Sequence, residues 1–409
     1  MFERFYIKLI FFVAMCVILL NNICVAQDDL NNTLEKAADN KEQLKQVLNY
    51  YSNEKEKLVA VKYLISNLWA HTKGSGKCDA SVITANYLIQ TIDSAYFKWK
   101  EMPWARHVTF EEFCEWLLPY KVVETQSIDK WSEKLYNLLW DNIRNMPPDD
   151  DEYNTATKTA LMVRQTLREK LQYNINLYGQ NNLTTIEEML YVKSATTSYY
   201  SQLLVAACRS VGVPAVLDES ALKGLYPTTM FYDTTYKTAN QWAVILTSQG
   251  LEMPIANDIS AEESYAFFPY DKCPKVYRNT FAVNQRVKHY MQTAKYHYSF
   301  GLCKHDVTDK YFLTTDLSIP IVFKLLKMLK DSYVYIAAEV YMGNQEQKDW
   351  LIVDFGEIKD DCALFCKMGR DINYLIMGYN GTELIPISKP FQLCKNGSIK
   401  WLDDEVVEN

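Results

Sequence analysis

Ser194-Ala195-Thr196-Thr197 begins the stretch of sequence that decides the fold, and the stretch continues to Leu246. Apolar residues follow at helical spacing and predict an amphipathic helix with one buried face: Leu203, Leu204, Ala207, Cys208 and Val211. Gly212-Val213-Pro214 ends that helix, because Gly and Pro commonly terminate helices. Strands are predicted near Ala215–Leu217, Trp242–Leu246 and Met253–Ile255. A helix followed by such strands predicts an α+β unit.

The regions on either side of this unit differ in their periodicity. Residues 30–145 carry apolar stripes at helical spacing, and Thr109-Phe110-Glu111-Glu112 has the pattern of a capping box. From about residue 310, strand signals dominate, and Asn380-Gly381 and Asn396-Gly397 predict hairpin turns, because both central residues can take positive φ. The predicted fold class is therefore α+β: an N-terminal helical region, an α+β core and a C-terminal antiparallel β-sandwich.

The chain has 409 residues, which exceeds one ordinary core, so we expect it to divide into domains. The run from Pro147 to Asp151 is the clearest boundary signal. We predict a signal peptide at 1–26, a helical region at 27–150, the core with its linker at 151–300, and the sandwich at 301–409.

Residues 1–26 have the pattern of an export signal. Arg4 and Lys8 accompany an apolar run, Leu9–Leu20, that is too short to span a bilayer comfortably. Cys24-Val25-Ala26 resembles a cleavage site before Gln27, and the alternative is that Cys24 is itself the lipidated residue of a lipoprotein. No later segment is long and apolar enough to cross a membrane. The expected location is extracytoplasmic: the periplasm, the outer surface or the medium.

Composition excludes some functions and leaves others open. A net charge of −7 gives no basic footprint for nucleic acid. The 29 Tyr suit a surface that contacts peptide or glycan, but Tyr also fills the cores of β-sandwiches. The five His are scattered and no Cys-x-x-Cys pair exists, so we predict no zinc site and no cofactor. The acidic run Asp149–Glu152 could bind calcium or serve as a solvated linker.

The thiols and imidazoles offer no obvious catalytic pair. Cys208 lies on the apolar face of the predicted helix, where a Cys behaves as a small hydrophobic residue with a raised pKa. No His lies between residues 152 and 280, and His289 and His297 follow the core in the linker. We predict Cys208 to be a core residue and both His to be surface residues.

Several stretches form a recognisable set when they are taken together: Leu34–Ala37 with Asn40, Leu48–Tyr51, Ala60–Ile65, Trp116–Val122, the helix from Thr197 to Pro214 with Gln241–Val244, Pro274–Arg278, Asp306–Asp309, and Met368–Ile372 with Tyr374-Leu375. This set resembles secreted transglutaminase-like proteins of Bacteroides-type bacteria, which have a papain-type core. In such a core a Cys begins the helix and a His lies two residues before a Trp on the next strand. Here Thr197 and Asn240 occupy those two positions, and Asp258 lies near the position of the acid.

The resemblance therefore implies the fold without its usual chemistry. A threonine hydroxyl has too high a pKa to ionise unaided, and an asparagine side chain cannot accept its proton. Asp258 then has no imidazole to orient. We expect a cleft that persists without catalysis, lined by Thr197, Tyr199, Asn240 and Trp242.

Three functions remain open at this point. The leading hypothesis is an exported, catalytically inactive binding or scaffold module for peptide or glycan. The alternative is an active peptidase, amidase or acyl transferase of the transglutaminase-like superfamily with relocated catalytic residues. A third is a structural envelope component without a defined pocket. The sequence does not indicate an oligomeric state.

Overall fold

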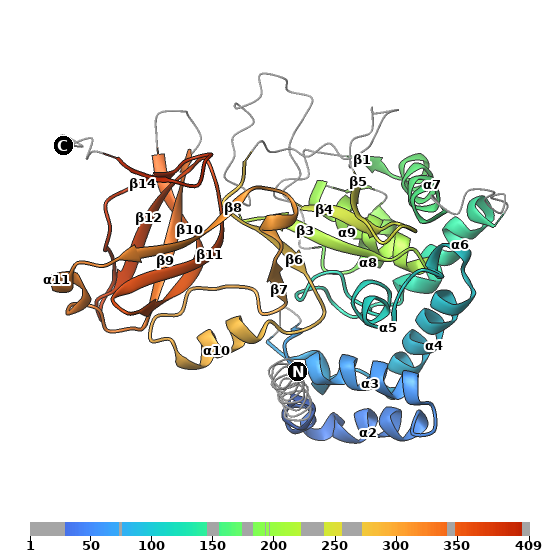
Figure 1. Cartoon of the computed structure of the whole chain (residues 1–409). Helices are drawn as coiled ribbons and strands as arrows, with labels where there is room; N and C mark the ends of the chain where they lie inside the picture. The colour runs from blue at the N-terminus through green and yellow to red at the C-terminus, as the bar shows by residue number, and fades with distance from the viewer. Residues whose placement is uncertain are drawn as a thin grey trace, which may run out of the picture.

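The computed structural model describes residues 29–72, 76–144, 155–173, 183–192, 194–195, 197–221, 241–255, 272–341 and 348–402. Three parts lie side by side: N-terminal helices, a central sheet with helices on one face, and a curled C-terminal sheet (Figure 1). The predicted α+β class is confirmed.

The N-terminal region is helical, as predicted. Its elements are η1 (Ala38–Asn40), α2 (Lys41–Tyr50), α3 (Lys55–Asn67), η2 (Asp79–Ser81), α4 (Ala85–Glu101), η3 (Pro103–Ala105), α5 (Phe110–Glu112), the π-helical turn η4 (Phe113–Leu117) and α6 (Trp131–Ile143). The predicted capping box begins α5: the Thr109 hydroxyl accepts from the Glu112 amide at 3.2 Å, and the Glu112 carboxylate accepts from the Thr109 amide at 2.8 Å.

The central unit follows in sequence. Its helices are α7 (Thr155–Lys170), α8 (Ile186–Val192), α9 (Thr197–Ser210) and α10 (Gln285–Thr293), and the short strands β1 (Gln172–Tyr173) and β2 (Ser194–Ala195) pair in parallel. The five-stranded sheet has the order β5-β4-β3-β6-β7 and is antiparallel throughout. Its strands are β3 (Ala215–Ser220), β4 (Gln241–Leu246), β5 (Glu252–Ile255), β6 (Val276–Asn279) and β7 (Lys304–Asp306).

Helix α9 ends where the sequence predicts. Gly212 has a φ of 90°, and the Val213 amide donates to the Cys208 carbonyl at 2.9 Å, so the chain turns out of the helix through a left-handed residue. A Cβ on Gly212 would also meet the Met102 side chain at 3.0 Å. The turn delivers the chain directly into β3.

Strand alternation decides which side chains of this sheet face α9. Ala215, Leu217, Ala243 and Ile245 belong to one hydrophobic core with α9 and the N-terminal helices. Val216, Trp242, Val244 and Leu246 belong to a second cluster on the other face. The first core thus contains residues that precede and residues that follow the predicted domain boundary near residue 150. The boundary residues Pro147 to Asp151 themselves lie outside the described residues.

The C-terminal region is an eight-stranded antiparallel sheet. Its strands follow the order β15-β14-β12-β9-β10-β11-β8, with β13 paired to β12. The elements are η5 (Thr308–Lys310), β8 (Thr314–Pro320), α11 (Phe323–Leu326), β9 (Tyr333–Tyr341), β10 (Lys348–Lys359), β11 (Cys362–Gly369), β12 (Ile372–Tyr379), β13 (Leu384–Pro386), β14 (Phe391–Leu393) and β15 (Ile399–Trp401).

The strands of the predicted sandwich thus belong to one continuous hydrogen-bonded sheet. The register shifts between Ile352 and Asp354 and between Phe365 and Met368, and such irregularities bend a sheet. The sheet curls over its own core, which includes Phe365, Tyr374 and Phe391.

The two predicted hairpin turns form, but with a different backbone. Only the glycines have positive φ, 107° at Gly381 and 84° at Gly397. Asn380 and Asn396 do not use the positive φ that they can adopt. Each Asn side chain instead accepts main-chain amides in the turn, from Thr382 at 2.8 Å and from Ser398 at 3.0 Å. An Asx turn satisfies these amides without a left-handed asparagine.

Close packing joins the central unit to the C-terminal sheet. The fully buried Lys275 ammonium contacts Asp306 and lies 3.1 Å from an Asp354 carboxylate oxygen, and Arg286 approaches the other Asp354 oxygen at 3.0 Å. A Cβ on Gly369 would lie 1.9 Å from the Cys273 carbonyl oxygen, so only glycine fits. Lys275 and Arg286 hold the pKa of the Asp354 carboxyl below its usual range, against the effect of burial.

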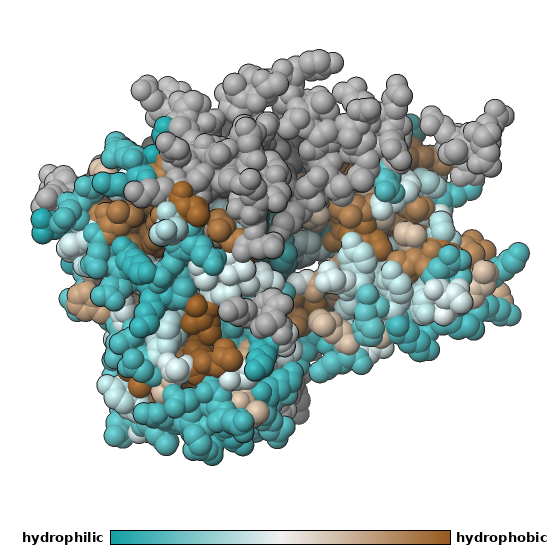
Figure 2. Space-filling view, turned by 180° about the vertical axis from the view of Figure 1, so that it is seen from behind, coloured by the Kyte–Doolittle hydropathy of each residue, from teal (hydrophilic) through white to brown (hydrophobic). Residues whose placement is uncertain are grey.

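Many tyrosines serve as core residues at this same junction. Tyr290, Tyr333, Tyr335 and Phe355 are buried together, with Tyr296 and Tyr298 packed against them. This cluster accounts for part of the aromatic excess by packing. Seen from behind, the surface is largely hydrophilic with separate hydrophobic patches (Figure 2). In the described part of the chain, no helix has the length and apolar character needed to cross a membrane.

Candidate functional site

The first turns of α9 meet the beginning of β4 through polar side chains. The Ser201 hydroxyl donates to the Gln241 carbonyl at 2.8 Å, and the Gln202 amide donates to the Gln241 side-chain oxygen at 3.1 Å. Position 197 lies one helical turn before Ser201 on the same side of α9, and position 240 directly precedes Gln241. The described contact between the two elements is therefore the one that Ser201 and Gln202 make with Gln241.

The residues predicted for catalytic positions are only partly described. Thr197 is the first residue of α9, but its side chain lies outside the described part of the structure. Asn240 and Asp258 lie outside the described residues altogether. Their arrangement stays a prediction.

Glu219 extends the polar junction along β3. One of its carboxylate oxygens accepts from the Gln241 amide at 2.8 Å and from the Asn279 amide at 3.3 Å, and the other pairs with the Lys304 ammonium. Ser201, Gln202, Gln241, Glu219, Asn279 and Lys304 form what we call the α9–β4 junction. These six residues are hydrogen-bonded to one another, and these bonds supply partners for their buried polar groups.

The other two residues predicted to line the cleft face different directions. Tyr199 is half-buried against the core that contains α9, and burial raises the pKa of its phenol. Trp242 is buried on the face of the sheet opposite α9, where its indole donates to the Tyr311 hydroxyl at 3.0 Å. The structure therefore does not bring Trp242 to the side of the sheet that carries Ser201 and Gln202.

Trp242 belongs instead to a second buried network. Asp218 accepts two hydrogen bonds from the Arg278 guanidinium, both at 2.8 Å, and one from Tyr311 at 2.6 Å. Arg278 also donates to Glu252 at 2.9 Å. Burial alone would raise the pKa of the Glu252 carboxyl, but the Arg278 guanidinium holds that pKa below its usual value. Bidentate pairing of this kind fixes β3, β5 and β6 relative to one another.

Cys208 is a core residue, as predicted. It lies in the C-terminal half of α9 with no exposed surface, and burial raises the pKa of its thiol to about 12. A thiol with such a pKa is protonated at neutral pH and is a poor nucleophile. His289 and His297 are exposed, also as predicted.

A thiol and an imidazole do meet elsewhere, far along the sequence. Cys303 Sγ lies 3.7 Å from His71 Nε2, and each residue is 1% exposed. Burial raises the pKa of the thiol and lowers that of the imidazole to about 3, so both groups are neutral. His71 Nε2 also lies 2.9 Å from the Phe281 carbonyl, to which it must donate. That nitrogen cannot then accept the thiol proton, which a catalytic pair requires.

Metal ligation finds no support among the described side chains, where no group of three or more His, Cys, Asp or Glu converges. The acidic run Asp149–Glu152, a possible calcium ligand set by sequence, lies outside the described residues. The eight cysteines that follow the predicted signal peptide are all described and all free.

Sequence reasoning missed most of the α9–β4 junction. Gln241 and Glu219 could have been noticed as polar residues within apolar strand runs, since a buried strand position needs a partner for such a group. Ser201 lies one turn after Thr197 and carries a weaker signal. Lys304 carries none, because its pairing with Glu219 depends on how β7 reaches the sheet.

Comparison with known proteins assigns no family. No family model matches the chain, and no curated protein matches it significantly. Among solved structures, the chain is similar to a protein from Cytophaga hutchinsonii described as a “putative cysteine protease”, at 13% identity and a TM-score of 0.23. The match covers 32% of this chain and 38% of that protein. A similarity this weak supports no conclusion about activity.

Proposed function

We propose that the chain is an exported protein with a transglutaminase-like core that is catalytically inactive and binds peptide or glycan. The observation that carries this proposal is the α9–β4 junction: the described side chains at the start of α9 and β4 are amides and a hydroxyl, and β3 adds a paired carboxylate. Ser201, Gln241 and Glu219 are buried and bonded within the junction, whereas the partly exposed Gln202 amide can also bond a neutral polar ligand. None of these groups supplies a thiolate or a free base for acyl transfer.

Turnover is the direct test of the inactive state. The complete chain is incubated with glutamine-containing peptides and an amine donor, and with peptide substrates alone, next to Thr197→Ala and Cys303→Ala variants. We expect no product above the buffer control from any of the three proteins. Turnover that either variant abolishes would establish the alternative, an active peptidase, amidase or acyl transferase with relocated residues.

Binding is tested separately on peptide and glycan arrays. A defined set of ligands whose signal decreases in a Gln202→Ala variant would support a binding cleft at the junction. A matched control is Gln165→Ala, on the exposed side of α7, which should leave binding unchanged. An array without any signal would favour the third hypothesis, a structural envelope component.

The proposed export and domain division rest on sequence alone. Residues 1–26 should be absent from the mature protein, with Gln27 as its first residue, and mass spectrometry of the protein from cell fractions checks this. A lipid-modified N-terminus at Cys24 would contradict cleavage after Ala26. For the domains at 27–150, 151–300 and 301–409, limited proteolysis should cut first near residue 150 and near residue 300.

A further inference from the structure

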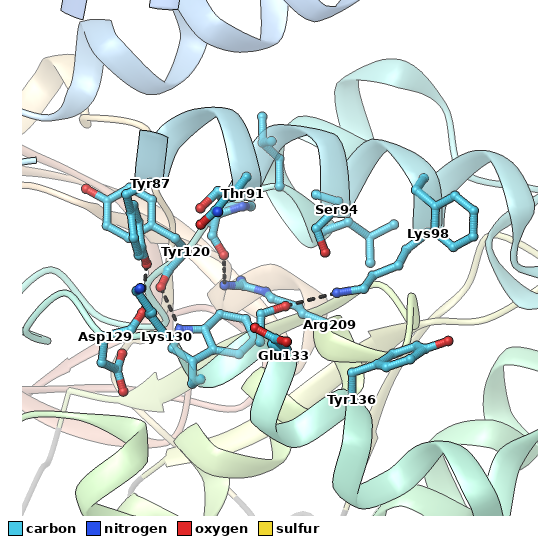
Figure 3. A pocket seen from close by; sticks show the side chains of 18 residues that line it. Tyr87, Thr91, Ser94, Lys98, Tyr120, Asp129, Lys130, Glu133, Tyr136 and Arg209 are labelled. Atoms are coloured by element: carbon cyan, nitrogen blue, oxygen red, sulfur yellow. Dashed lines mark hydrogen bonds between the residues drawn. The ribbon is translucent and has the colours of Figure 1, made fainter. Parts of the chain in front are cut away.

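A cavity of about 480 Å³ lies between α4 and α6, away from the α9–β4 junction (Figure 3). Aromatic and aliphatic side chains supply most of its walls: Tyr87, Phe97, Leu117, Trp131 and Tyr136. A volume of this size is within the range of small-molecule sites.

Lys98 extends into this cavity from α4 although it is only 6% exposed (Figure 3). Its ammonium group donates to the Ser132 hydroxyl at 2.9 Å and lies 5.7 Å from the centre of the Tyr136 ring. Among the described residues, no carboxylate lies within ion-pair distance of it. Burial without a carboxylate partner lowers the pKa of Lys98 to about 8, which leaves most of the side chain charged at pH 7.

Arg209 lines the inner wall of the cavity, and it is 4% exposed. Its guanidinium donates to the main-chain carbonyls of Trp116, Pro119, Lys121 and Ala215, at 2.7 to 3.3 Å. These bonds hold the group in place without neutralising it. Figure 3 shows the Lys98 ammonium on the side of the cavity toward Arg209.

The remaining charges on the cavity wall nearly balance. Lys130 and Glu133 are exposed, and Asp129 is half-buried with one carboxylate oxygen accepting from the Glu187 amide at 2.9 Å. Burial raises the pKa of Asp129 to about 6, so it is mostly ionised at pH 7. The lining thus holds three cations and two carboxylates, a surplus of one positive charge. A ligand with one negative charge would balance that surplus, and an apolar ligand body would fit the apolar walls.

We propose that this cavity binds a small organic monocarboxylate with an aromatic or aliphatic body, whose carboxylate accepts from Lys98 and Ser132 beside Arg209. The site goes beyond the proposed cleft function and does not depend on it. Buried cations without acidic partners are destabilising unless a ligand compensates them, and the ligand here would supply the missing negative charge.

Calorimetric titration of the complete chain tests the site with 2-naphthylacetate and its neutral analogue 2-naphthylacetamide. The carboxylate should bind about 10- to 100-fold more tightly than the amide, because a hydrogen bond to a charged partner is the stronger one. Lys98→Met should remove that preference and leave binding of the amide unchanged. Lys100→Met is the matched control: this lysine is on the same helix but pairs with Glu56 and does not line the cavity.

A second variant tests the proposal independently, in case the Lys98→Met protein does not fold. Ser94→Leu fills the cavity from α4 and should abolish binding of both compounds while helical circular dichroism stays normal. Equal binding of carboxylate and amide, no binding of either, or a preference that survives Lys98→Met would each overturn the proposal.

Discussion

The buried charged side chains of the central sheet have partners of opposite charge, whereas those of the α4–α6 cavity have none in the part of the chain that the structure describes. In the sheet, Asp218 pairs with Arg278, and Glu219 pairs with Lys304. In the cavity, Lys98 and Arg209 are equally buried and have no carboxylate partner among the described residues. Pairing in the sheet offsets the cost of burying each charge, whereas no described carboxylate offsets that cost for Lys98. The buried charges of the sheet are therefore accounted for by their partners within the fold, whereas the burial of Lys98 is not.

The largest effect should come from breaking the buried pair in the sheet. Asp218→Ala leaves the Arg278 guanidinium without its bidentate partner and Tyr311 without its acceptor. We expect a loss of about 3–5 kcal/mol in the free energy of unfolding, measured by urea denaturation. A loss below about 1 kcal/mol would mean that this pair does not hold the strands together.

Lys98→Met should have an effect of opposite sign. The pKa of Lys98 falls from 10.5 to about 8 on folding, which corresponds to a cost of about 3 kcal/mol when the side chain is charged in both states. The variant should therefore be more stable than the wild type at pH 7 by about that amount. Equal stability at pH 7 would contradict the unpaired burial of this lysine.

The same variant should lose its advantage at high pH. Below pH 8, both states of the wild type are protonated at Lys98, so the cost is fully present. Between pH 8 and 10.5, the folded state releases its proton first, and the wild-type free energy of unfolding rises with pH. Thermal denaturation across this range should show the two proteins converging, and a constant difference would contradict the assignment.

Glu219→Gln probes the α9–β4 junction with a smaller change. The substitution keeps the shape and one oxygen that can accept from Gln241 and Asn279, but it removes the charge and the oxygen that accepts from Lys304, which is partly exposed. We expect a loss of about 1–2 kcal/mol, since solvent screens part of the interaction. The loss should shrink in high salt, whereas a salt-independent loss would indicate packing as the cause.

Ser132→Ala should have the smallest effect of the series. It removes the hydroxyl that accepts from Lys98, at a cost of about 1 kcal/mol. Combined with Lys98→Met, the serine change should have almost no further effect. A double-mutant cycle measures this coupling, and additive effects would contradict a direct contact between the two side chains.

Local signals predicted much of the fold. Helix α9 with its Gly212 end, and β4 at Gln241–Leu246, lie where periodicity and turn residues place them. Cys208 was predictable as a core residue because its neighbours on the helix face are apolar. The curl of the C-terminal sheet was not predictable, since it depends on pairings between strands distant in sequence and on two register shifts.

The sites depend on contacts that no sequence window contains. Lys98, Ser132 and Arg209 come from three separate helices, and nothing local distinguishes Lys98 from the exposed Lys100. Glu219 and Lys304 are similarly distant. The positions of Thr197 and Asn240 were predicted from a resemblance, and Ser201 and Gln241 provide the described contact nearest to them.

We propose that positions 197 and 240 face one another across the cleft. The test is a variant that carries both Thr197→Cys and Asn240→Cys, oxidised under mild conditions and mapped by mass spectrometry of its peptides. We expect a disulfide that joins these two positions, which requires Cα atoms within about 7 Å. Two unlinked thiols, or links to other cysteines alone, would contradict the claim.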